Sequence, residues 1–188
     1  EFIMDQDYLK ATQENTNLAE FFKTVLKLKT IPRQGWINKL GLQDPESVAD
    51  HCFSTAVIAM ILSAKKNLDT TKIIKMSLLH DLAEAITGDL TPDDIPKLKK
   101  IEMENSAMAQ ILSNLDNSQK LEYSAIWNEY QKNSSKEAKL LHQIDKLEMA
   151  MQAIVYHKKG HTTSFFTSAK AEITDNELLK ILEKFYKD

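Results

Sequence analysis

The segment KEAKLLHQIDKLEMAMQAIVY, residues 136–156, predicts a long amphipathic helix. Its apolar residues recur every three or four positions and form one stripe suited to burial, made of Leu140, Leu141, Ile144, Leu147, Met151 and Ile154. Ser134 followed by Glu137 is typical of a capping box, so we expect the helix to begin at about Lys136 and to end near Tyr156. A helix of this kind forms one side of a bundle core.

The rest of the chain also favours helices. Only four Gly and four Pro occur in 188 residues, and the long segments between them are rich in Ala, Leu, Met, Lys and Glu. Further helices are predicted at about 18–28, 48–64, 70–88, 98–115 and 119–130, with a last one ending at Phe185. Ser47 with Asp50 and Thr174 with Glu177 predict two more helix starts. We therefore expect an all-α, single-domain helical bundle.

The helix expected at 48–64 has apolar positions that suit burial, namely Val48, Phe53, Val57, Met60 and Ile61. Residues 1–3 precede Met4 and look like a cloning scar, so the single domain is expected to span residues 4–188. The length of 188 residues is enough for one domain with a sizeable core and no need of disulfides.

Composition and charge limit the partners of the protein. Hydrophobic residues make up 43% and charged residues 27%, which is typical of a globular chain. The mean hydropathy of −0.37 and the lack of a long apolar run predict no membrane span. A net charge of −3 offers no basic field for nucleic acid or anionic lipid, so we expect a small-molecule partner. The lone Cys52 cannot form an internal disulfide and no signal segment opens the chain, so a cytoplasmic location is expected.

Four residues form a candidate metal site. His80 and Asp81 lie late in an apolar segment, where polar groups need partners, and a metal ion is a partner for both. His51 lies in the first turn of the preceding helix, and Asp145 lies on the shoulder of the 136–156 stripe. Such a mixed nitrogen and oxygen set suits one divalent ion, Mn²⁺, Fe²⁺, Co²⁺ or Zn²⁺. The ion would leave positions for a water of lowered pKa and a substrate oxygen.

The series His51, His80-Asp81 and Asp145 resembles the HD-domain superfamily of metal-dependent phosphohydrolases, whose signature is H…HD…D on a helical bundle. The local sequences ESVADH (46–51), HDLAEAITGD (80–89) and QID (143–145) are similar to the branch of 5′-deoxynucleotidases. The resemblance covers about residues 18–156 and implies a nucleotide substrate, a deoxyribonucleoside 5′-monophosphate.

The resemblance also implies a role for each matching residue. The metal ligands would be His51, His80, Asp81 and Asp145. Glu84 would be the catalytic carboxylate, and its spacing of four from His80 predicts the same helix face. Asp89 would act beside it in catalysis and meet the 3′ hydroxyl of the sugar. Arg33 would bind the phosphate and Trp36 would pack on the deoxyribose, although two residues separate a pair that is adjacent in the family.

Other readings stay open from the sequence. The same ligands also serve phosphodiesterases and nucleoside triphosphate hydrolases, and a non-catalytic metal or nucleotide sensor would keep them as well. As an alternative to substrate binding, Trp36 would only cover the core and Arg33 would only pair with an acidic surface residue. Lys97, Lys99 and Lys100 are expected to be solvated, and His142, His157 and His161 receive no role. The apolar stripes are broad enough for a homodimer as well as a core.

Overall fold

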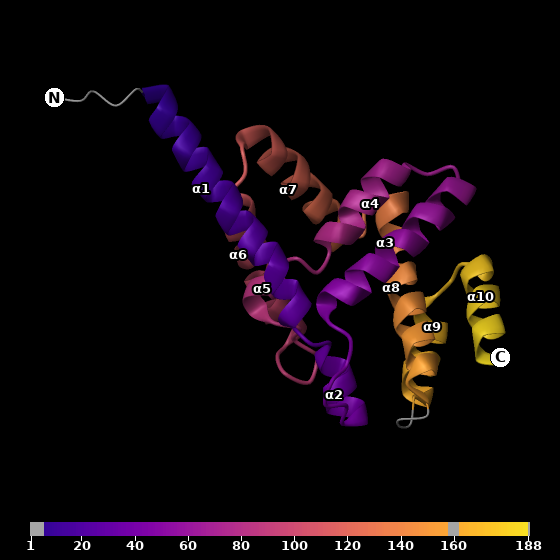
Figure 1. Ribbon diagram of the computed structural model, residues 1–188. Helices are drawn as coiled ribbons and strands as arrows, with labels where there is room; N and C mark the ends of the chain where they lie inside the picture. The colour runs from indigo at the N-terminus through magenta and orange to yellow at the C-terminus, as the bar shows by residue number, and fades with distance from the viewer. Residues whose placement is uncertain (1–5, 158–161, 188) are drawn as a thin grey trace.

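Figure 1 shows the computed structural model, which describes residues 6–157 and 162–187. Its helices in chain order are α1 (Gln6–Lys27), η1 (Leu28–Thr30), α2 (Gln34–Leu40), α3 (Val48–Lys65), α4 (Thr70–Leu79), α5 (Glu84–Thr87), α6 (Lys97–Leu112), α7 (Asn117–Gln131), α8 (Lys136–Val155), α9 (Thr163–Glu172) and α10 (Asn176–Lys187). Within these residues the one β-pairing is an isolated bridge between Pro32 and Ser47. The expected all-α fold is confirmed. The proposed cloning scar, residues 1–3, lies outside the described residues.

The core forms where α3, α4 and α8 pack against one another, and α9 and α10 also pack against α8 (Figure 1). The expected burial of the 136–156 stripe is confirmed for Leu140, Leu141, Ile144 and Leu147, whereas Met151 and Ile154 are half-buried. Leu141 and Ile144 have no exposed surface. Complete burial of such a side chain contributes about 1.5–3 kcal/mol to stability. Because α8 contacts both α3 and α4, it determines the position at which polar side chains from these helices approach one another.

The start of α3 is held by the predicted capping box. The Ser47 hydroxyl accepts the Asp50 backbone N–H at 3.2 Å, and Asp50 Oδ2 accepts the Ser47 backbone N–H at 2.9 Å. These bonds satisfy two backbone donors that a helix start otherwise leaves unpaired. They also fix the first turn, in which His51 is fully buried and faces α8.

The outer face of α3 differs from the expectation. Val48 is buried as predicted, but Phe53 is 70% exposed, and Val57, Met60 and Ile61 are also exposed. The inward face consists instead of smaller residues such as Cys52, Ala56 and Ala59, together with Leu62. Small side chains let α4 and α8 approach closely, so the larger apolar residues are left outside.

The composition of α3 is also relevant to the expectation that the chain has no membrane span. Among the described residues, it is the one helix long and apolar enough to suit a membrane span by these two criteria alone. A core helix of a globular protein meets the same criteria, and α3 packs against α4 and α8. The absence of a membrane partner therefore stays a prediction.

The single helix expected at 70–88 is wrong, because α4 ends at Leu79 and α5 begins at Glu84. Between them the backbone winds more tightly: the Leu82 N–H reaches the Leu79 carbonyl at 3.1 Å, and the Glu84 N–H reaches that of Asp81 at 3.0 Å. Hydrogen bonds to the carbonyl three residues earlier, as in a 3₁₀ helix, turn side chains away from the directions they have in an α-helix. Gly88 ends α5 with a φ of +74°, a conformation that glycine adopts without steric cost.

Smaller departures concern helix ends and two helices that the sequence did not predict. The cap of α8 is Ser135, which accepts the Ala138 N–H, and the Ser134–Glu137 box is therefore wrong by one residue. The start of α10 is held by Asp175 instead of Thr174. The sequence did not predict α2 and α9, and α1 begins at residue 6, well before the expected 18.

Candidate metal centre

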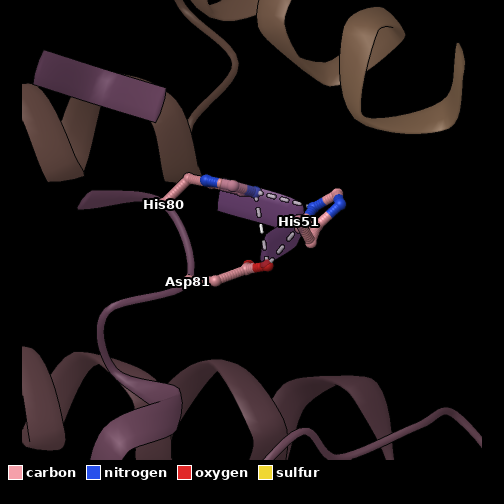
Figure 2. Close-up of side chains that lie close together, drawn as sticks. All are labelled: His51, His80 and Asp81. Carbon is pink, nitrogen blue, oxygen red and sulfur yellow. Dashed lines mark hydrogen bonds and ion pairs between the residues drawn. The ribbon is translucent and has the colours of Figure 1, made fainter. Parts of the chain in front are cut away.

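Three parts of the bundle bring the four expected ligands to one point. His51 comes from α3, His80 and Asp81 from the turn after α4, and Asp145 from α8. His51 Nε2 lies 3.4 Å from His80 Nε2 and 3.6 Å from Asp81 Oδ2 (Figure 2). The same nitrogen lies 3.2 Å from Asp145 Oδ1, and His80 Nε2 lies 3.3 Å from Asp81 Oδ2. The donor atoms of His51, His80 and Asp81 thus face a common centre, and Asp145 adjoins it through His51 Nε2.

The hydrogen bonds of both imidazoles direct Nε2 toward this centre. His80 Nδ1 lies 2.6 Å from the Ser77 carbonyl oxygen, and His51 Nδ1 lies 2.6 Å from Glu148 Oε2. Because these oxygens only accept, both Nδ1 atoms carry the hydrogen, and a neutral ring then has its lone pair on Nε2. Two lone pairs and two carboxylates so close together repel one another unless a cation lies between them.

The distances also fit a divalent ion. Ligands about 2.0–2.2 Å from an ion lie roughly 2.8–3.6 Å from their neighbours in octahedral or tetrahedral arrangements. The observed separations of 3.2, 3.3, 3.4 and 3.6 Å are close to that range. Imidazole and carboxylate together suit Mn²⁺, Fe²⁺, Co²⁺ or Zn²⁺. The chemistry of the donor set is therefore that of a metal centre.

Electrostatics keep both carboxylates ionised. Burial raises the pKa of Asp145, but the hydrogen bond from His51 and the charge of Lys146 hold it well below its usual value. Burial also opposes ionisation of Asp81, whose pKa is nevertheless lowered by His80 and Arg33. Burial and Arg33 lower the pKa of His51, but hydrogen bonds with Asp145 and Glu148 outweigh them and raise it to about 9. A proton and a metal ion therefore compete for His51 Nε2.

Glu84 is a buried carboxyl group beside the centre. Its side chain opens α5 and is 2% exposed, and Oε2 has no hydrogen-bond partner among the described residues. Burial, with the charges of Asp81 and Asp89, raises the pKa of Glu84 well above its usual value. The expectation that Glu84 follows His80 on one continuous helix is wrong, but the tight turn brings both to the same cavity. A carboxyl group whose pKa is raised can serve as a general acid.

Arg33 and Asp89 flank the centre from two loops. Arg33 Nη1 lies 3.3 Å from Asp81 Oδ2, and Asp89 Oδ2 accepts the Gln34 backbone N–H at 2.7 Å. Burial works against the Arg33 charge, but Asp81 and Asp89 outweigh it and raise the pKa of the guanidinium. The loop after α5 is thus tied to the start of α2, and a permanent cation lies next to a metal ligand.

Trp36 is almost completely buried, whereas a residue that stacks on a sugar needs an open ring face. It is 2% exposed, and its ring centroid lies 4.4 Å from that of Phe165 and 5.3 Å from that of Tyr156. Its Nε1–H donates to Glu46 Oε1 at 2.8 Å. The indole therefore belongs to a small aromatic cluster, from which it also lines the cavity beside Arg33.

A cavity of about 780 Å³ joins these groups, and its size is that of a small-molecule site. The predicted site residues on its wall are Arg33, Trp36, His80, Asp81, Glu84, Asp89 and Asp145. His51 is not on the wall, because it approaches the metal centre from behind.

Sequence reasoning missed three residues near the centre. Lys100, expected to be solvated, donates to the Leu90 carbonyl at 2.6 Å and lies 3.8 Å from Glu84 Oε1. His142, given no role, is half-buried and lines the cavity, with its ring stacked on that of Tyr130. Glu148 binds His51, and its spacing of three from Asp145 is a signal that could have found it. Of the other two histidines given no role, His157 is exposed, and His161 lies outside the described residues.

A family model described as an HD domain matches residues 25–185, which is most of the chain. The chain belongs to the HD-domain family. The resemblance seen in the sequence is thereby confirmed, together with the fold. Membership in the HD-domain family implies a divalent metal ion, and the group of His51, His80 and Asp81 can hold it.

Relatives of this HD-domain chain include proteins with assigned activities. The 5′-deoxynucleotidase HDDC2 of Homo sapiens is 36% identical over 173 residues, covering 89% of this chain and 84% of that protein. That of Dictyostelium discoideum is 40% identical over 172 residues, covering 84% and 90%. A solved structure, a conserved hypothetical protein from Pyrococcus furiosus, has a TM-score of 0.75 and 31% identity, covering 90% of this chain and 99% of its own.

Metal binding should stabilise the protein measurably. Mn²⁺ at a hundred times its dissociation constant contributes about 2.7 kcal/mol, which raises the Tm of a chain this long by about 5–10 °C. Asp145→Ala should abolish most of this shift, because it removes one of two neutralising carboxylates. The exposed residue His157 provides the control, His157→Ala, which should keep the shift. Thermal unfolding of chelator-treated protein with and without Mn²⁺ makes the measurement, and an undiminished shift in Asp145→Ala would contradict the site.

Proposed function

We propose that this HD-domain chain is a metal-dependent phosphomonoesterase that hydrolyses deoxyribonucleoside 5′-monophosphates to deoxynucleoside and phosphate. The observation that carries the proposal is the single cavity in which Arg33 and the buried Glu84 lie beside the ligands His80, Asp81 and Asp145. The relatives named 5′-deoxynucleotidase support the same reaction and a nucleotide substrate.

The metal ion would be held by His51, His80, Asp81 and Asp145. When bound, a divalent ion such as Mn²⁺, Co²⁺, Fe²⁺ or Zn²⁺ supplies charge neutralisation and a water of lowered pKa. All other steps fall to the side chains of the protein itself. The four protein ligands make one ion the proposed stoichiometry.

Arg33 suits the phosphate of the substrate. Its guanidinium stays charged, faces the cavity and uses one nitrogen on Asp81, which leaves further N–H donors for phosphate oxygens. Glu84 suits the leaving group, because a carboxyl group with raised pKa can give its proton to the departing 5′ oxygen. The two residues thus act at opposite sides of the phosphorus–oxygen bond that breaks.

Asp89 and Trp36 suit the sugar. One Asp89 oxygen is held by the Gln34 N–H, and the second can accept the 3′ hydroxyl. The same bond fixes the distance between this carboxylate and α2, which carries Trp36. Because Trp36 is packed against Phe165 and Tyr156, it would limit the space for a 2′ hydroxyl as a rigid wall.

Turnover should depend on Glu84. Glu84→Gln keeps the shape of the side chain but cannot exchange a proton, so kcat should fall by about 10²–10⁴-fold. The measurement is phosphate release from matched deoxy and ribo 5′-monophosphates after chelation and return of Mn²⁺, Co²⁺ or Zn²⁺. The matched control is Glu102→Gln, an exposed glutamate of α6, which should keep full activity.

The same assay, extended to phosphodiesters and nucleoside triphosphates, separates the other candidate activities. The proposal is supported if phosphate is released from the deoxy substrates in the presence of metal, and if Glu84→Gln loses this activity while Glu102→Gln keeps it. Release only from diesters or triphosphates would replace it with a phosphodiesterase or a nucleoside triphosphate hydrolase. Tight metal binding without turnover of any substrate would identify a sensor instead.

We also propose that the chain forms a homodimer through the outer face of α3. Phe53, Val57, Met60 and Ile61 are exposed there at successive turns, and none of the four carries charge. A two-fold dimer places one patch opposite its own copy, so an uncharged apolar stripe complements itself. The cytoplasmic location and the single domain at 4–188 remain predictions from the sequence.

Sedimentation analysis tests the dimer. Phe53→Glu should sediment as a monomer, because the stripe cannot bury a charge without a partner. Phe53 is already 70% exposed within one chain, so folding should tolerate the change. The control Leu121→Glu changes a residue of α7 that is 73% exposed and should leave the dimer intact. A wild-type chain that remains monomeric throughout the concentration series would refute the proposal.

A further inference from the structure

A buried carboxylate that the proposed reaction does not use lies directly behind the metal centre. Glu148 is 4% exposed on α8, and its Oε2 is 2.6 Å from Nδ1 of the fully buried His51. The other contacts of the ring, with His80, Asp81 and Asp145, are all made by Nε2. Glu148 therefore contacts the side of His51 that faces away from the centre.

This contact determines which nitrogen of His51 is available to an ion. A neutral imidazole carries one hydrogen, and the carboxylate of Glu148 can only accept it, so the hydrogen stays on Nδ1. The lone pair is then on Nε2, at the centre. A carboxylate behind a ligating imidazole also makes the ring a stronger electron donor and restricts its rotation.

The geometry of α8 supports this role. Asp145 and Glu148 are three residues apart and lie on one face of the helix, so they contact opposite nitrogens of the same ring. His51 is thus held between two carboxylates of a single rigid helix. One of them is a proposed ligand, and the other has no place in the proposed ligand set.

A second glutamate, Glu46, lies near this pair and contacts Trp36 on the cavity wall. Glu46 accepts the Trp36 Nε1–H at 2.8 Å, and its own backbone N–H donates to the Tyr156 hydroxyl at 2.9 Å. Burial and the nearby charge of Glu148 raise the pKa of Glu46. Glu46 thus lies within electrostatic reach of Glu148 and also binds Trp36 on the cavity wall.

We propose that Glu148 is a positioning residue, which holds His51 with Nδ1–H toward α8 and Nε2 toward the metal ion. The inference rests on the metal centre of the proposed function. Glu148 acts on the ion only through His51, and touches neither the ion nor the substrate. A buried ion pair that merely stabilises the fold is the competing explanation.

A double-mutant cycle on Mn²⁺ affinity tests this role. Calorimetric titration of chelator-treated protein should show that Glu148→Gln binds Mn²⁺ about 10–100-fold more weakly than the wild type, because a neutral amide supports the imidazole less. In a His51→Ala background the same change should alter the dissociation constant less than about twofold, since the residue through which Glu148 acts is gone.

A matched control separates positioning from stability. Glu137 is another buried glutamate of α8, but it binds Lys72 and the Asp69 N–H instead of His51. Glu137→Gln should lower the Tm of the metal-free protein and leave the Mn²⁺ dissociation constant unchanged. Glu148→Gln should change that constant, and saturating Mn²⁺ should restore most of its phosphate release.

The outcomes are distinct. Wild-type affinity in Glu148→Gln, or an equal loss with and without His51, would overturn the inference. If the wild type binds Mn²⁺ but releases no phosphate from any monophosphate, the proposed reaction fails, while the Glu148 inference is decided by the dissociation constants alone. A wild type that binds no Mn²⁺ overturns both.

Discussion

The need of four clustered polar side chains for a cation between them, either a proton on His51 or a metal ion, is the constraint around which this protein is built. Donor atoms of His80, Asp81 and Asp145 lie 3.2–3.6 Å from His51 Nε2, and His80 Nε2 lies 3.3 Å from Asp81 Oδ2. Such a cluster is unfavourable by itself, and its members come from α3, from the turn after α4, and from α8. The packing of these three helices supplies the free energy that holds the donors together. A cation then turns the repulsion into attraction.

Local structure assigns the remaining groups to the two sides of this centre. On the cavity side, the tight turn at 80–83 and the positive φ of Gly88 direct Asp81, Glu84 and Asp89 toward the same space as Arg33. On the far side, Glu148 holds the second nitrogen of His51. The proposed proton, phosphate and sugar contacts thus come from α5 and the loops around the cavity, and the proposed ligands from α3, α8 and the turn after α4. This division matches the common placement of reactive groups on loops that a rigid scaffold positions.

The sequence predicted what depends on residue type and local spacing. The stripe of α8, the Ser47 capping box and the convergence of four ligand residues follow from periodicity and from the cost of polar groups in apolar segments. It missed what depends on packing between helices. The apolar pattern of residues 70–88 is the same with or without the break between α4 and α5, so the pattern does not reveal the break. Helical periodicity also does not show that Trp36 packs α2 into an aromatic cluster. Phe53 is exposed because α3 approaches its neighbours closely at Ala56 and Ala59. Lys100 looked solvated because its partner, the Leu90 carbonyl, belongs to a loop whose path the sequence does not give.

The central claim is that these four side chains, from three parts of the bundle, hold one ion. Its most direct test is a crystal structure of the protein with Mn²⁺, with anomalous diffraction measured on both sides of the manganese absorption edge. The account predicts one anomalous peak per chain, about 2.0–2.4 Å from His51 Nε2, His80 Nε2 and one oxygen each of Asp81 and Asp145. A peak ligated by His51 Nδ1, or one located elsewhere in the cavity with these four side chains unligated, would contradict it.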